Sequence, residues 1–213
     1  MKTYITLFAF VALPFTGLSA QSKYCDKLIQ NGDTVVCQDF GHKGKVFREH
    51  FYVKGKREFT RWWHYRKNGE YQFIQHKKKS VFAKKHGPAM QFYPDGKVKL
   101  YVFYQNGIRT GKCYSYYPSG KMKSACNSND KGRPDGLLTE FYENGQVMNQ
   151  ARWIDGLIVE VLVNKDEQGY DVPFGTLLYG TGTWLYREPG TNNVWVHHYQ
   201  DGKLIKTTKV QNQ

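Results

Sequence analysis

The sequence predicts an all-β fold, an elongated antiparallel sheet of stacked β-hairpin repeats. Three segments, GPAMQFYPDG, GKCYSYYPSG and GLLTEFYENG, share the form G-x4-[FY]-Y-x2-G, and their closing glycines recur after 24 and then 25 residues. A second glycine turn recurs between them, in YQNG, DKG and WIDG. Two turns in each period indicate two strands in each repeat, and a fixed period of this length is typical of repeat arrays.

The chain begins with a predicted signal peptide, residues 1–20. An early Lys2, an apolar stretch and the small residues Ser19 and Ala20 form the expected pattern. The apolar stretch is shorter than the roughly 20 residues that a membrane-spanning helix needs. We therefore expect cleavage near Ala20, export to a periplasm or out of the cell, and no transmembrane segment in the mature chain.

Residues 21–40 are expected to form an N-terminal cap that carries a disulfide. The chain has four cysteines, an even number, and disulfides are the usual state of such cysteines in an oxidising compartment. In CDKLIQNGDTVVC, a three-residue loop at Gln30-Asn31-Gly32 would place Cys25 opposite Cys37. This pairing predicts the first disulfide.

The second disulfide is predicted within the repeats. In KCYSYYPSGKMKSAC, a loop at Ser119-Gly120, or from Pro118 to Lys121, places Cys113 directly opposite Cys126. Directly opposed strand residues have the separation that a disulfide requires. The alternative for all four cysteines is a set of buried or metal-binding thiols.

Nearly all the net positive charge lies in a basic block, residues 41–85. This block holds fourteen Lys and Arg against three Glu and ten aromatic residues, in a chain whose net charge is +13. A basic surface attracts polyanions, and aromatic rings stack on bases or sugars. The candidate contact residues are Lys54, Arg57, Arg61, Trp62, Trp63 and Lys77. The alternative is that the lysines keep strand edges soluble while the aromatic rings form the core.

The partners expected for an exported basic protein are anionic glycans, lipid head groups or another protein. The HKKKS run in the basic block has no RNA-recognition signature beside it, so we expect no sequence-specific nucleic-acid binding.

Residues 41–206 are expected to form the repeat domain, followed by a tail at 207–213. The clearest copies span 87–157, with looser copies at Arg61–His86 and Gly180–Leu204. Adjacent rings in each repeat point to opposite faces of the sheet, and the sequence leaves open which ring is buried. The predicted turn glycines are Gly96, Gly107, Gly120, Gly132, Gly145 and Gly156.

No pattern of catalytic, cofactor-binding or metal-ligating residues is recognisable. His197 and His198 are adjacent on a predicted strand, so they point to opposite faces and cannot share a metal ion. The glycines form neither a phosphate-binding loop nor a nucleophile elbow, and the acidic residues form no evident dyad. We therefore predict no catalytic residue, no cofactor and no metal site.

The turns FYPDGK, YYPSGK and FYENGQ resemble the bacterial variant of the MORN (membrane occupation and recognition nexus) repeat. The resemblance is good over Gly87 to Leu157 and absent from Gln21 to Phe40. It implies an elongated sheet of stacked hairpins without enzymatic activity. Bacterial proteins of this kind are often labelled YwqK-like antitoxins, which implies a toxin as partner.

These observations predict an exported, non-catalytic repeat scaffold that binds an anionic polymer of the cell envelope, a membrane surface or a protein. The alternative is an antitoxin or immunity-type protein that neutralises a toxin by protein contact. Salt separates the two, because polyanion binding weakens steeply as salt rises, whereas toxin binding need not.

Overall fold

The computed structural model describes residues 25–41, 43–77, 84–188, 191 and 193–210. Every regular element within these ranges is a β-strand or an isolated bridge, so the predicted all-β class is confirmed. The predicted signal peptide and its cleavage site lie outside the described residues.

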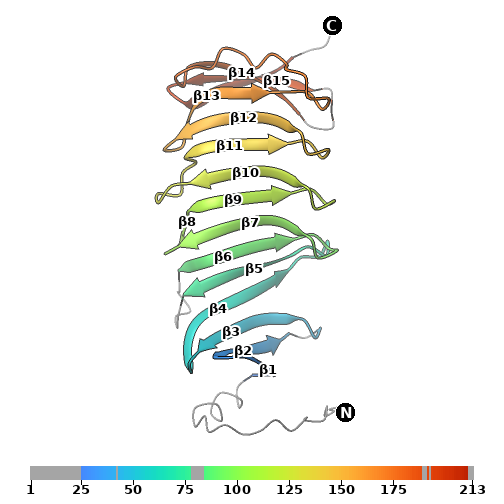
Figure 1. Ribbon diagram of the computed structural model, residues 1–213, viewed down its shortest axis with the longest axis vertical. Helices are drawn as coiled ribbons and strands as arrows, with labels where there is room; N and C mark the ends of the chain where they lie inside the picture. Colours follow the sequence, from blue (N-terminus) through green and yellow to red (C-terminus); the bar gives the residue numbers. More distant parts are fainter. Residues whose placement is uncertain (1–24, 42, 78–83, 189–190, 192, 211–213) are drawn as a thin grey trace.

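A long antiparallel sheet of thirteen strands follows the order of the chain. Figure 1 shows these strands stacked one after another along the longest axis of the molecule. β8 is the exception, because it pairs with β7 beside the main path. The strands of the long sheet are β1 (Lys27–Asn31), β2 (Thr34–Phe40), β3 (Val46–Val53), β4 (Lys56–Tyr65), β5 (Tyr71–Lys77), β6 (Lys85–Phe92), β7 (Val98–Gln105), β8 (Ile108–Arg109), β9 (Gly111–Tyr116), β10 (Met122–Ser128), β11 (Gly136–Phe141), β12 (Val147–Ile154) and β13 (Leu157–Asn164).

A second sheet of three strands lies at the C-terminal end. It contains β14 (Gly182–Arg187), β15 (Val194–Gln200) and β16 (Lys203–Lys209), in that order. The looser repeat expected at Gly180–Leu204 therefore belongs to a separate sheet. The last strand of this sheet, β16, extends into the tail expected at 207–213. The C-terminal region packs against the end of the long sheet. The two parts together form one core cluster: Ala151, Ile158, Val161, Leu177, Trp184 and Tyr199.

The last strand of the long sheet, β13, has its outer edge covered by two turns. The amide of Gly180 donates to the Val159 carbonyl at 2.7 Å, and the amide of Ile158 donates to the Gly202 carbonyl at 3.2 Å. A Cβ at Gly202 would lie 2.5 Å from the Leu157 Cβ, so only glycine permits this approach. The covered backbone is no longer available for pairing with another chain.

The six predicted repeat glycines all have positive φ and lie in turns. The Gly96 amide donates to the Tyr93 carbonyl at 3.0 Å, and the Tyr93 amide donates to the Lys97 carbonyl at 2.9 Å. The turns at Gly120 and Gly145 repeat this bond pattern. Glycine is favoured there because its missing Cβ removes the steric penalty of the left-handed conformation.

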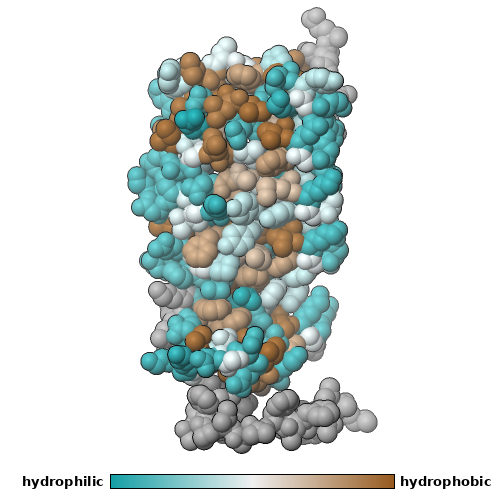
Figure 2. All heavy atoms as spheres, viewed as in Figure 1, coloured by the Kyte–Doolittle hydropathy of each residue, from teal (hydrophilic) through white to brown (hydrophobic). Residues whose placement is uncertain are grey.

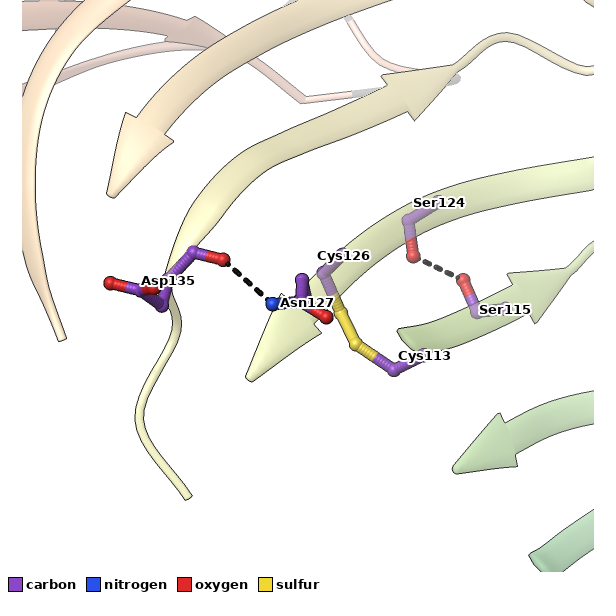
Figure 3. The surroundings of a disulfide bond; sticks show 6 residues. All are labelled: Cys113, Ser115, Ser124, Cys126, Asn127 and Asp135. Atoms are coloured by element: carbon purple, nitrogen blue, oxygen red, sulfur yellow. Dashed lines mark hydrogen bonds between the residues drawn. A yellow bond between two sulfur atoms is a disulfide. The ribbon is translucent and has the colours of Figure 1, made fainter. Parts of the chain in front are cut away.

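The disulfide between Cys113 and Cys126 is confirmed (Figure 3). The two residues are directly paired across β9 and β10, with their Cα atoms 5.1 Å apart. The register near the turn differs from the prediction, because Met122 pairs with Tyr116 rather than Tyr117. A bulge before Ser124 then restores the expected pairing further along the hairpin.

The pairing predicted for Cys25 and Cys37 is wrong. The β1–β2 loop is the two-residue Gly32-Asp33, and Leu28 rather than Cys25 lies opposite Cys37. The two thiols still meet, but a hydrogen bond joins them in place of the predicted disulfide. Burial and this hydrogen bond raise the pKa of the Cys37 thiol to about 12.

Candidate binding surface

The two faces of the long sheet have different side chains in the basic block. One, the disulfide face, carries Cys37, His50, Thr60 and Ala89 in register with Cys113 of the repeats. The other, the aromatic face, carries the rings of β3, β4 and β5. Since strand residues alternate between faces, each predicted contact residue can be assigned to one of them.

A buried carboxylate organises the aromatic face. Glu49 is only 6% exposed and accepts hydrogen bonds from Trp63 Nε1 at 2.8 Å and Gln38 Nε2 at 2.9 Å. Arg61 forms an ion pair with Glu49 at 3.4 Å, and its guanidinium lies over the rings of Phe51 and Phe73. Burial lowers the pKa of Arg61. Arg61 therefore compensates an internal charge and is poorly placed to contact a partner.

Trp63 is a packing residue of the same cluster. Its ring centroid lies 5.0 Å from that of Phe73 and 6.2 Å from those of Tyr71 and Phe92. Tyr71 and Phe92 stack on each other at 4.8 Å. Rings of this kind contribute packing energy beyond the area that they bury.

Trp62 points to the opposite face, as predicted for neighbouring strand residues. It is 36% exposed and lies 6.4 Å from the Phe47 ring. The Arg48 guanidinium lies 5.4 Å from the Trp62 ring and donates to Asp39 at 2.6 Å. Trp62 thus offers an exposed ring beside a fixed cation.

Arg57 is placed on the disulfide face with Trp62. It pairs with Tyr52 across β3 and β4, while Trp62 pairs with Arg48 in the same two strands. Burial, Arg48 and Arg57 together lower the pKa of His50, which lies between these positions. Burial is the largest of these causes, and the charges of Arg48 and Arg57 add to it while Asp39 opposes it.

The lysines of the basic block lie mainly in turns and at strand ends. Lys54 has a φ of 47° in the turn between β3 and β4, and Lys77 ends β5, with its side chain outside the described residues. Figure 2 shows the matching pattern on one face, with hydrophilic side chains along both sides of an apolar midline. Six exposed lysines of the basic block form no salt bridge with any described residue: Lys43, Lys45, Lys54, Lys56, Lys67 and Lys84.

The structure therefore divides the six predicted contact residues. Arg57 and Trp62 share one face, and Lys54 lies in a turn at the end of the same hairpin. Arg61 and Trp63 belong to the internal cluster on the other face. Sequence reasoning did not distinguish these roles, because the burial of Glu49 depends on strands that lie apart in the sequence.

A ladder of tyrosine hydroxyls, which the sequence analysis missed, connects successive repeats. Tyr93 donates to the Tyr116 carbonyl at 2.7 Å, Tyr117 to the Phe141 carbonyl at 2.7 Å, and Tyr142 to the Lys165 carbonyl at 2.8 Å. The recurrence of a tyrosine three residues before each turn glycine was the available signal. These hydroxyls are engaged within the sheet.

Comparison with protein families identifies the central hairpins. The family model described as MORN repeat variant matches residues 85–106, 109–130 and 134–155. These three segments are MORN repeat variants. Each MORN repeat contains one hairpin of the long sheet: β6–β7, β9–β10 or β11–β12. The resemblance inferred from the turns is confirmed for these segments.

The MORN repeats indicate a scaffold, a type of protein that is typically non-catalytic. A search of curated proteins found no match. Among the described residues, no group of three or more His, Cys, Asp and Glu side chains is arranged to hold a metal ion. The same residues contain no helix able to cross a membrane.

Proposed function

We propose that this protein is an exported MORN-repeat scaffold whose basic block binds an anionic polymer or an anionic membrane surface of the cell envelope. The observation that carries the proposal is the set of exposed lysines of the basic block that form no salt bridge with a described residue, together with the exposed ring of Trp62 in the same block. Cations that are not held in salt bridges remain available to attract a polyanion, and binding releases the counterions of that polyanion.

The arrangement also suggests how the surface is organised. Lys54 and Lys56 flank the turn that ends the β3–β4 hairpin, and Arg57 and Trp62 follow along β4. A sugar ring or head group could stack on Trp62 while phosphate or sulfate groups contact the lysines. The internal cluster around Glu49 would hold this hairpin in shape.

The test is retention on heparin and on vesicles containing anionic lipid, across a salt gradient. One variant reverses four exposed cations of the basic block, Lys43→Glu, Lys54→Glu, Lys56→Glu and Lys67→Glu. The matched control reverses four exposed cations elsewhere, Arg109→Glu, Lys121→Glu, Lys203→Glu and Lys206→Glu. Both variants change the net charge of the chain equally, so a difference between them reports location.

We expect the basic-block variant to lose retention at physiological salt and the control to keep most of it. Trp62→Ala should weaken binding several-fold in a folded protein. Equal retention of both variants, with circular dichroism showing that both are folded, would overturn the proposal. The next candidate would then be the shallow groove of about 390 Å³ lined by Met90, Val98, Tyr101, Lys112, Tyr114 and Tyr116. Tight, salt-insensitive capture of a protein by the basic-block variant would instead favour the antitoxin function.

A further inference from the structure

A second cavity lies between the second and third MORN repeats and the C-terminal sheet. Its volume is about 300 Å³, and it is lined by Tyr117, Lys123, Glu140, Phe141, Met148, Tyr186 and Glu188. The first five belong to the long sheet or its turns, and the last two belong to β14 and the segment after it. The cavity therefore depends on the C-terminal sheet, which stands beyond the matched repeats.

The cavity has an acidic character that contrasts with the rest of this basic chain. Neither Glu140 nor Glu188 forms a salt bridge with a described residue. Glu188 is held by Asn193 Nδ2 at 2.9 Å, and its hydrogen bonds lower its pKa, so it is a carboxylate at neutral pH. Burial and then the charges of Glu140 and Glu188 raise the pKa of Tyr186 to about 12. Both carboxylates thus lie close enough to Tyr186 to affect its pKa.

A buried acceptor lies beside Glu140. Asn149 is only 1% exposed, and its Nδ2 donates to Glu140 Oε2 at 2.8 Å. The Oδ1 atom of Asn149 has no hydrogen-bond partner among the described residues. A buried acceptor without a donor is costly, and this one belongs to the residue that holds the Glu140 carboxylate in place.

The rings of the cavity suit an organic cation. Tyr117, Phe141 and Tyr186 contribute aromatic surface, and Met148 contributes a polarisable side chain. The Lys123 ammonium already lies 5.6 Å from the centroid of the Tyr117 ring. An alkylammonium can therefore occupy such a position in this protein. Lys209 also acts on Glu188, so an incoming ammonium would share the two carboxylates with resident cations.

We propose that this cavity binds a primary alkylammonium group, with Glu140 and Glu188 as its counter-charges and the aromatic rings around its methylene stem. The group could come from a lysine side chain of a polypeptide or from a free polyamine. The inference is independent of polyanion binding, because its residues lie in the second and third repeats and the C-terminal region, outside the basic block.

The experiment is a titration of the full mature protein, with its methionine methyl groups labelled with carbon-13, followed by NMR. The probes are Nα-acetyl-lysine N-methylamide and spermidine. The neutral control is the same lysine derivative with its ε-amine acetylated. We expect a saturable shift of the Met148 methyl with both amines, little shift of Met90 in the other groove, and no saturable shift with the acetylated compound. Tighter binding of spermidine would indicate a free polyamine, and tighter binding of the lysine derivative would indicate a polypeptide.

Matched variants test the carboxylates. Glu140→Gln and Glu188→Gln should each weaken amine binding about tenfold or more, whereas Glu58→Gln, an equal charge change at an exposed site of the basic block, should leave it unchanged. A saturable Met148 shift of equal affinity with the acetylated compound would overturn the proposal. So would wild-type affinity in the folded double Glu140→Gln, Glu188→Gln variant, or the absence of any saturable shift with the amines. The acetylated compound keeps the test decisive even if a variant fails to fold.

Discussion

The basic block and the MORN repeats belong to one sheet but are stabilised and charged differently. Strands β3 to β5 pack around a buried Glu49 and a set of stacked rings, whereas tyrosine hydroxyls link successive repeats and a disulfide joins the two strands of the second repeat. In residues 87–157, nine Lys and Arg stand against six Asp and Glu, and several form ion pairs, such as Arg133 with Asp155 at 2.9 Å. The basic block contains fourteen Lys and Arg but only three Glu.

This difference shows which positions of a repeat sheet can vary in sequence while the hairpins keep their register. The turn glycines and the tyrosine ladder occupy the strand ends of each repeat, so neighbouring hairpins can differ on their faces without losing their register. The block with the strongest charge lies where the repeat pattern is weakest. The proposed binding surface thus lies at the N-terminal end of the long sheet, outside the three matched repeats.

The largest expected effect separates the two neighbouring tryptophans. Trp63→Ala removes a ring packed on Phe73 and also leaves the buried Glu49 without one of its donors. We expect a loss of about 3 to 5 kcal/mol in the free energy of unfolding. Trp62→Ala, the matched control at a partly exposed position, should cost clearly less, about 1 kcal/mol, because it removes the contacts with Phe47 and Arg48 but uncovers no buried charge. Urea unfolding followed by circular dichroism measures both.

Hydrogen exchange sharpens this prediction. In a repeat sheet each hairpin contacts mainly its neighbours, so Trp63→Ala should reduce amide protection in β3 to β6 and leave β11 to β13 nearly unchanged. A uniform loss of protection along the chain would show that the two regions unfold as one unit. Equal stability losses in the Trp62 and Trp63 variants would contradict the assignment of the two faces.

The periodic features of this structure could be predicted from the sequence, whereas contacts between side chains on different hairpins could not. The strand pairing, the turn glycines and the Cys113–Cys126 bond follow from spacing, because a hairpin register depends on residues that are near in the chain. The Cys25 pairing failed because one loop sequence permits two lengths. The role of Arg61 depends on Glu49, twelve residues away on another strand. Spacing alone does not show that this carboxylate is buried.

The second prediction tests what the disulfide contributes to the repeats. Cys113→Ser should cost about 3 kcal/mol in the free energy of unfolding, the value expected for a loop closed over 13 residues. Cys25→Ser, the control in the N-terminal region, removes a hydrogen bond with Cys37 rather than a disulfide and should cost about 1 kcal/mol. Peptide mapping without reduction accompanies the unfolding curves. If Cys113→Ser and Cys25→Ser lowered the free energy of unfolding equally and mapping found a Cys25–Cys37 link, the predicted second disulfide would be present. The two regions would then not differ in this respect.

The smallest expected effect concerns the tyrosine ladder. Tyr142 is 6% exposed, and its hydroxyl donates to the Lys165 carbonyl at 2.8 Å, so Tyr142→Phe deletes one bond while keeping the ring. We expect a loss of about 1 kcal/mol, because the Lys165 carbonyl loses its donor in a partly buried place. Tyr170→Phe is the control, since that ring is 72% exposed and its hydroxyl makes no hydrogen bond with a described residue. It should change stability by less than about 0.5 kcal/mol. If the two variants were equally stable, water would replace the ladder bond without cost, and ring packing and backbone pairing alone would connect one repeat to the next.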